Sequence, residues 1–142
     1  MSSLIFPDIN VWLAILLNKH AHRDLAKAWW DLEECETIAF VRLTQIGVLR
    51  LLTTAAVMNG QPLGMSEACD KLFADERVAF LDEPRGFERR FRGHTTQKKS
   101  SPKLWADAWL LAFVELAEAR LVTFDQALAA RCKNAVLLTS AG

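Results

Sequence analysis

The segment Leu4-Ile5-Phe6-Pro7-Asp8-Ile9-Asn10-Val11-Trp12-Leu13 contains the most informative change of pattern in the chain. Its first three residues are apolar and stop at Pro7-Asp8, whereas from Val11 onward the apolar residues follow helical spacing. We therefore predict a buried strand at residues 4–6 that leads directly into a helix. Asp8 stands at the point where the strand gives way to the helix.

The same alternation of strand and helix patterns continues to the end of the chain. Apolar runs of strand length occur at Thr37–Phe40, Val78–Leu81, Arg120–Phe124 and Ala135–Leu138. Helical patterns lie between them, at His22–Glu34, Leu43–Val57, Ser66–Ala74 with Ser66 as N-cap, Glu83–Gly93, Gln126–Arg131, and in a helix that opens with Ser101 as N-cap and Pro102 as its first residue. This order predicts an α/β fold, with a mostly parallel central sheet covered by helices on both faces.

The composition is that of an ordinary globular protein, with 142 residues, 51% hydrophobic and 24% charged. We expect a single domain over residues 1–142, and this composition excludes disordered and fibrous classes. No apolar stretch approaches the roughly 20 residues of a membrane-spanning helix. The N-terminus lacks the basic start and the cleavage site of a signal peptide, so we expect a cytoplasmic protein with no membrane association.

Three aspartates stand where a solvated surface does not require them. Asp8 and Asp125 each follow a predicted strand, and Asp107 lies in the second turn of an otherwise apolar predicted helix. Because the carboxyl ends of parallel strands meet at one edge of a sheet, Asp8 and Asp125 are expected at the same edge. The alternative for Asp8 (or Asn10) and for Asp125 is a simple helix N-cap, and a structural Asp107 would have to face water.

If these acids converge, each close pair repels by roughly 4 kcal/mol at an effective dielectric constant near 20. A divalent cation that prefers hard oxygen ligands removes this penalty, so Mg²⁺, with Mn²⁺ as a second possibility, is the expected cofactor. A bound ion of this kind polarises a phosphodiester and lowers the pKa of an attacking water. We therefore expect hydrolysis by metal-activated water at Asp8, Asp107 and Asp125.

Four pieces of the sequence carry short motifs. They are Phe6-Pro7-Asp8-Ile9-Asn10-Val11-Trp12-Leu13, Arg42-Leu43-Thr44-Gln45-Ile46-Gly47-Val48-Leu49-Arg50, Trp105-Ala106-Asp107-Ala108 and Leu121-Val122-Thr123-Phe124-Asp125. These motifs resemble the PIN-domain nucleases, and among them the VapC toxins of bacterial toxin–antitoxin pairs. Each motif is short, but together they run in the family's order across nearly the whole chain. The resemblance implies a PIN-like three-layer α/β/α domain, Mg²⁺-dependent cleavage of RNA, a homodimer, and a small VapB-like antitoxin that occupies the site.

The resemblance also assigns roles to individual residues. Asp8 and Asp107 match the principal metal ligands, and Asp125 matches a further acid that acts more often through water. Thr123 and Asn10 match polar residues that steady the carboxylates by hydrogen bonding.

One position departs from the family pattern, because Gln45 stands where a glutamate is usual. A glutamine keeps a carbonyl oxygen that can ligate a cation and adds an amide donor that could hold a phosphate, but it removes one negative charge. Metal affinity is therefore expected to fall, and nearby Arg42 is a second candidate for the substrate phosphate. Gln45 could also be an ordinary polar residue on an exposed turn.

Formal net charge is zero, so affinity for RNA has to come from a local cluster. Basic residues are dense between Arg85 and Lys103, and Glu88 is the only acid among them. This segment could be a solvated helix face followed by a flexible loop, but the resemblance favours contact with RNA phosphates through Lys98, Lys99 and Lys103. His94 in this loop is a weaker candidate for a proton donor.

Other side chains carry less information. The sequence favours a surface role for His20 and His22. The five tryptophans are expected to pack in the core or at a dimer interface rather than to stack on bases.

Two readings compete with a ribonuclease. Loss of the fourth carboxylate at Gln45 is the one feature that favours a non-catalytic module that binds RNA or protein. A DNA or flap nuclease of the same fold is the near neighbour in chemistry.

Overall fold

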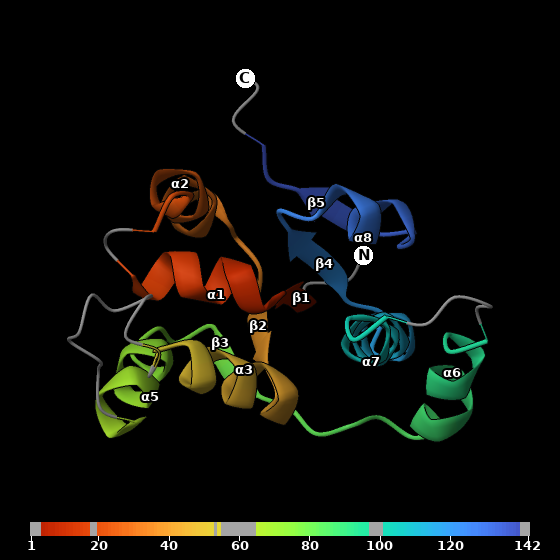
Figure 1. Ribbon diagram of the computed structural model, residues 1–142. Coiled ribbons are helices and arrows are strands. Elements are labelled where there is room, and N and C mark those ends of the chain that lie inside the picture. The colour runs from red at the N-terminus through yellow and green to blue at the C-terminus, as the bar shows by residue number, and fades with distance from the viewer. Residues whose placement is uncertain (1–3, 18–19, 53, 55–64, 97–100, 140–142) are drawn as a thin grey trace.

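The computed structural model describes residues 4–17, 20–52, 54, 65–96 and 101–139 (Figure 1). Its sheet has the strand order β3-β2-β1-β4-β5, and every neighbouring pair is parallel. The strands are β1 (Leu4–Pro7), β2 (Thr37–Phe40), β3 (Val78–Phe80), β4 (Arg120–Thr123) and β5 (Ala135–Leu137). The predicted α/β class with a parallel central sheet is therefore confirmed.

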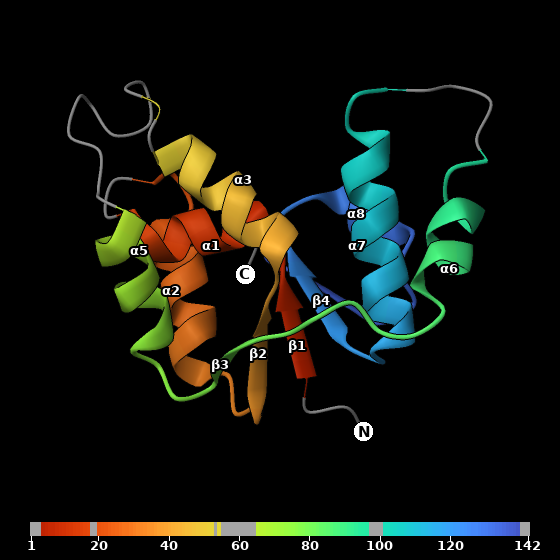
Figure 2. The same cartoon turned by 90° about the horizontal axis from the view of Figure 1, so that it is seen from below.

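Helices cover both faces of this sheet, which completes the three layers (Figure 2). They are α1 (Ile9–Leu16), α2 (Arg23–Leu32), α3 (Arg42–Leu52), α5 (Met65–Phe73), α6 (Phe87–Gly93), α7 (Leu104–Leu116) and α8 (Gln126–Ala130). Figure 2 shows α1, α2, α3 and α5 on one side and α6, α7 and α8 on the other.

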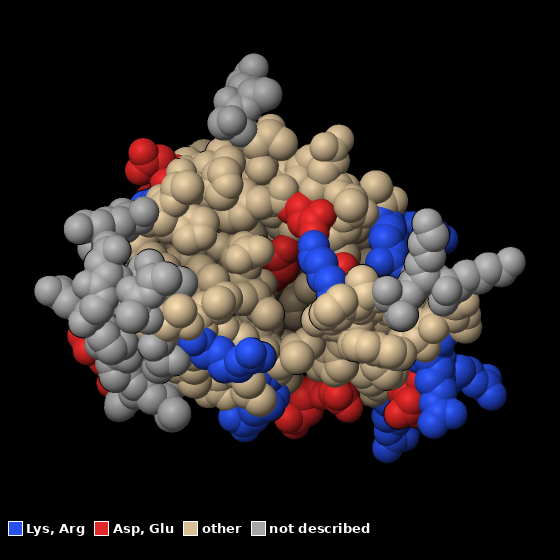
Figure 3. Space-filling view, in the orientation of Figure 1, with Lys and Arg blue, Asp and Glu red and all other residues tan. Residues whose placement is uncertain are grey.

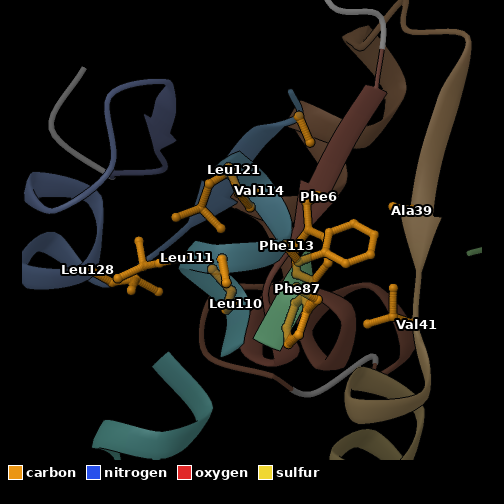
Figure 4. Packing of buried hydrophobic residues seen from close by; sticks show 12 residues of the cluster. Phe6, Ala39, Val41, Phe87, Leu110, Leu111, Phe113, Val114, Leu121 and Leu128 are labelled. Atoms are coloured by element: carbon orange, nitrogen blue, oxygen red, sulfur yellow. The ribbon is translucent and has the colours of Figure 1, made fainter. Parts of the chain in front are cut away.

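The buried core lies on both faces because successive strand residues point in opposite directions. Phe6 and Leu121 pack under α7 in the cluster drawn in Figure 4, where Phe87 and Phe113 complete the aromatic centre. Ile5, which precedes Phe6, and Val122, which follows Leu121, face the other way and pack with Val11 of α1. Each fully buried aliphatic or aromatic side chain contributes about 1.5 to 3 kcal/mol, so these faces fix the strands and with them the residues at the strand ends.

The start of α7 differs from the prediction. Ser101 does not cap the helix and Pro102 is not its first residue, because the Leu104 amide bonds to the Ser101 carbonyl at 3.0 Å and closes a separate turn before the helix begins. Asp107 consequently lies in the first turn of α7 and not in the second. The helix dipole favours an acid in the first turn, so the position of Asp107 has a structural explanation that the sequence pattern did not reveal.

Other element boundaries shift by smaller amounts. Helix α6 begins at Phe87 rather than Glu83, since Pro84 and the left-handed Gly86 (φ 78°) interrupt the chain before it. Helix α5 already includes Ser66, which is therefore not its N-cap. The predicted end of the third helix, at Val57, lies outside the described residues. None of the described helices is both long enough and apolar enough to span a membrane.

Candidate active site

A cavity of about 270 Å³ opens where β1 and β4 end. Figure 3 shows acidic and basic side chains gathered around a hollow on this face of the molecule. Apolar side chains form most of the wall, and the polar lining residues are Asp8, Asn10, Thr44, Lys103, Asp107 and Asp125. The structure thus brings the three predicted acids, which are distant along the chain, to one cavity.

Asp8 is the most buried of these acids, with 8% of its surface exposed. It is the N-cap of α1, and its Oδ1 accepts hydrogen bonds from the backbone amides of Asn10 (3.1 Å) and Val11 (3.2 Å). Its Oδ2 accepts a hydrogen bond from the hydroxyl of fully buried Thr123. Burial raises the pKa of Asp8, the nearby charge of Asp125 adds to this, and the three hydrogen bonds oppose it.

Asp125 is held in a similar way at the start of α8. Its Oδ1 accepts a hydrogen bond from the Leu128 amide at 3.1 Å, and its own amide donates to Thr123 Oγ1 at 2.9 Å. Lys103 forms an ion pair with its Oδ2. The hydrogen bond from Lys103 is the main reason that the pKa of Asp125 lies below its usual value. Thr123 therefore links Asp8 and Asp125, since it donates to one and accepts from the other.

Asp107 enters the cavity from the first turn of α7 and has a different environment. Within the described part of the chain, its half-buried carboxylate accepts no hydrogen bond. Burial raises the pKa of Asp107 and the charge of Asp125 raises it further, while Lys103 and Arg131 lower it. Lys103 is in turn attracted by all three acids, and its pKa is raised. The cavity thus contains more negative charge than its single lysine neutralises.

The donor set fits a hard divalent cation. Three carboxylates and the Thr44 hydroxyl line the cavity, the described lining residues include no histidine or cysteine, and Asp107 has unused acceptor capacity. Among the described residues, no three His, Cys, Asp or Glu side chains lie close enough to hold one ion by themselves. Mg²⁺ keeps several water ligands and needs only one or two carboxylates.

Two predicted residues of α3 lie outside this cavity. Gln45 does not line it, and its side-chain oxygen accepts a hydrogen bond from Arg42. Arg42 lies over the ring of Phe80 at 4.7 Å and lines a neighbouring groove with Asp82. Thr44, which the sequence reasoning missed, is buried (3% exposed) and lines the acidic cavity. Leu43 and Thr44 both line the cavity, and a further helical rotation of about 100° turns Gln45 away from it.

The remaining predicted residues have mixed positions. Asn10 lines the cavity, but its backbone amide, not its side chain, bonds to Asp8. His94 does not line the cavity, and its Nε2 lies 2.8 Å from Glu115 Oε1. The predicted RNA-binding residues Lys98 and Lys99 lie outside the described residues.

The tryptophans divide in a similar way. Trp12 and Trp30 are core residues, as the sequence favoured. Trp105 is 54% exposed, so core packing is wrong for this residue.

Known solved structures share the fold. VapC20 of Mycobacterium tuberculosis, a Sarcin-Ricin loop cleaving toxin, superposes with a TM-score of 0.66 at 14% identity and covers 89% of this chain and 94% of its own. PAE2754 of Pyrobaculum aerophilum superposes with a TM-score of 0.62 at 21% identity and covers 96% of this chain and 85% of its own. At these identities the likeness concerns the fold alone.

Sequence comparison is more specific. The PIN domain model matches residues 5–134, which includes all three acids. Ribonuclease VapC41 of Mycobacterium tuberculosis is 36% identical over 132 residues, or 87% of this chain and 90% of the relative. Ribonuclease VapC44 of the same organism is 31% identical over 132 residues, or 86% of each chain. The chain therefore belongs to the PIN-domain family and, within it, to the VapC-type ribonucleases.

Proposed function

We propose that this protein is a metal-dependent endoribonuclease that acts as the toxin of a VapBC-type pair. The observation that carries the proposal is the convergence of Asp8, Asp107 and Asp125 on one cavity at the carboxyl end of the sheet. The names of the related ribonucleases support RNA as the substrate class. Its expected location is the cytoplasm.

Asp8, Asp107 and Asp125 would hold Mg²⁺ or Mn²⁺, with Asp125 acting directly or through water. When bound, such an ion would polarise the phosphodiester and lower the pKa of the attacking water. The residues of the chain prepare this site. Thr123 and the amides of α1 fix the direction of the Asp8 carboxylate before substrate arrives, which lowers the cost of organising the site at the moment of reaction.

Substrate binding would use the basic residues beside the acids. Lys103 lines the cavity, and its partly exposed side chain can reach a phosphate when a metal neutralises Asp125. Lys98 and Lys99 precede it in the chain and extend the same role. Their charge would hold the RNA backbone while the acids are aligned with one phosphodiester.

A small antitoxin is the expected protein partner, and it would restrain the enzyme by covering the cavity. A homodimer is the expected assembly. Exposed apolar side chains, among them Ile46, Phe73 and Phe80, offer surface for such contacts.

The non-catalytic alternative has little support in the structure. It depended on the loss of a carboxylate at Gln45, and Gln45 does not line the acidic cavity. The three predicted acids, Asp8, Asp107 and Asp125, do line it.

The test is cleavage of single-stranded RNA with and without Mg²⁺ by the wild type, Asp107→Asn and Asp8→Asn. Asp24→Asn is the matched control, because Asp24 also lies in the first turn of a helix but is exposed and does not line the cavity. We expect Mg²⁺-dependent cleavage by the wild type and the control and none by the two site variants. Equal cleavage by all four proteins would refute the proposal, and parallel digestion of DNA would identify a DNA nuclease.

A further inference from the structure

Three aromatic rings form a stack at the end of β4, where Phe124 directly precedes the cavity residue Asp125. The ring of His22 lies 4.7 Å from that of Phe124, with 29° between their planes. The ring of His20 lies 6.5 Å from Phe124 with 20° between the planes, and 5.8 Å from His22. His22 is exposed, and His20 and Phe124 are half-buried. His20 and Phe124 are thus held against the protein, and the ring of His22 is open to solvent.

The fold holds this stack at the same edge of the sheet as the acids. Phe124 is the residue between Thr123 and Asp125, so its Cα lies about 3.8 Å from that of a cavity residue. Its side chain packs into the core cluster of Ile5 and Val122 on the α1 and α2 face. A ligand that extends from Asp125 across the end of β4 toward the α1 and α2 face would reach the stack.

The connection between α1 and α2 positions the two histidines. The His22 amide donates a hydrogen bond to Nδ1 of His20 at 3.0 Å, which orients the His20 ring. Arg23 donates to the Ile15 carbonyl and ties the start of α2 to α1. The chain thus fixes the backbone at His22 while it leaves the side chain open to solvent.

Packing alone does not require a histidine at position 22. An exposed ring contributes little to core burial, and α2 has no side-chain cap from its N-cap residue His22. A flat ring that is supported from behind and open in front is the arrangement that proteins use to stack nucleobases of single-stranded RNA. Every base has such a face, so a stacking site is compatible with many sequences.

We infer that His22, supported by Phe124 and His20, is a stacking subsite for a nucleobase of the RNA strand whose phosphate lies at the acidic cavity. This inference rests on the proposed ribonuclease function. Trp105 is more fully aromatic and 54% exposed, but it does not fulfil the same role. It does not line the cavity.

The test measures binding of short single-stranded RNA to the full chain carrying Asp107→Asn, which prevents cleavage. A series of oligonucleotides, each lacking the base at one successive position, is compared with the intact oligonucleotide by fluorescence anisotropy. Loss of the stacked base is expected to weaken binding by about 5- to 150-fold at one position only. His22→Ala should weaken binding of intact RNA by a similar factor.

The decisive result is the combination of both changes. If His22 stacks on that base, His22→Ala should have almost no further effect on the oligonucleotide that lacks it. His22→Phe keeps a ring and should retain most of the affinity, whereas Trp105→Ala should leave binding unchanged. Thermal unfolding of each variant checks that the exposed substitutions leave the fold intact.

Two results would overturn the subsite and leave the proposed function in place. One is unchanged RNA binding in His22→Ala, which would point instead to a protein partner or to no ligand. The other is an equal loss for intact RNA and for every RNA that lacks a base, which would mean that His22 acts without stacking. If the wild type cleaves no RNA with Mg²⁺ and the Asp107→Asn protein binds none, the proposed function fails together with the subsite.

Discussion

Asp107→Asn is expected to stabilise the protein in the absence of divalent metal while it abolishes cleavage. The carboxylate of Asp107 is half-buried, accepts no hydrogen bond within the described chain and faces the charge of Asp125. An asparagine has the same shape without the charge. Because water still screens this position, we expect a gain of only about 0.5 to 1 kcal/mol over the Asp24→Asn control, which loses a similar helix-dipole interaction. For a chain of this length, that corresponds to a rise in Tm of about 2 to 4 °C.

The pH dependence of this difference has a definite sign. The pKa of Asp107 is raised in the fold, so ionisation of this group opposes folding. The penalty is absent below the pKa of an unfolded aspartate, near 4, grows as the pH rises, and is complete above the folded pKa. The advantage of Asp107→Asn over wild type should therefore appear only as the pH rises through this window.

Mg²⁺ should reverse the order of stability. A ligand at 100 times its Kd stabilises the folded state by about 2.7 kcal/mol, which exceeds the gain from the substitution. Wild type should then unfold at the higher temperature, because the variant has lost a carboxylate ligand. Thermal unfolding between pH 4 and 8, with EDTA and with Mg²⁺, measures both effects. A variant that is less stable than wild type in EDTA at neutral pH would refute the account of Asp107 as a destabilising buried charge.

Three further substitutions test other parts of the site. Thr123→Val removes a fully buried hydroxyl that contacts both Asp8 and Asp125, so it should cost about 1 to 3 kcal/mol in urea unfolding and reduce cleavage; unchanged stability would contradict the hydrogen bonds of Thr123. Lys103→Gln should lower RNA affinity and reduce the slope of log affinity against log salt by about 1. The same substitution should tighten Mg²⁺ binding in calorimetry, because the ion no longer competes with an ammonium group for Asp125. Thr44→Glu should raise Mg²⁺ affinity, since position 44 lines the cavity, whereas Gln45→Glu should change it little; the opposite result would show that the side chain at 45 reaches the metal.

The order of the elements could be predicted because each one leaves a strong periodic pattern. The change of pattern within Leu4–Leu13 already predicts a strand that leads directly into a helix, and the structure confirms this order in β1 and α1. Element boundaries could not be predicted as well, because they depend on single hydrogen bonds. At Ser101-Pro102 the sequence offers an ideal helix start, yet the chain closes a turn there and begins α7 at Leu104.

Part of the candidate site could also be predicted from the sequence. Asp8 and Asp125 follow strands, and the topology of a parallel sheet is enough to bring such residues to one edge. The choice between Thr44 and Gln45 required more, since it depends on the residue at which α3 begins. The structure starts α3 at Arg42, and a shift of one residue would bring Gln45 to the place of Thr44. The stack of His20 and His22 on Phe124 depends on side-chain packing and left no pattern in the sequence.

The sequence left helix capping and metal chemistry as alternatives for Asp8. In the structure, the capping hydrogen bonds orient the same carboxylate that a metal would bind. The amides at the start of α1 occupy one oxygen of Asp8 and Thr123 contacts the other, so the carboxylate can point in only one direction. The burial that holds it there also raises its pKa, which means that the fold disfavours the ionised form of this carboxyl group. A dication would relieve the cost that the cap and the burial impose. The same reasoning applies to the N-cap Asp125, because a carboxylate held at a helix start has a fixed direction. Thr123 also fixes the Asp125 backbone relative to Asp8, since its hydroxyl donates to the Asp8 carboxylate and accepts from the Asp125 amide.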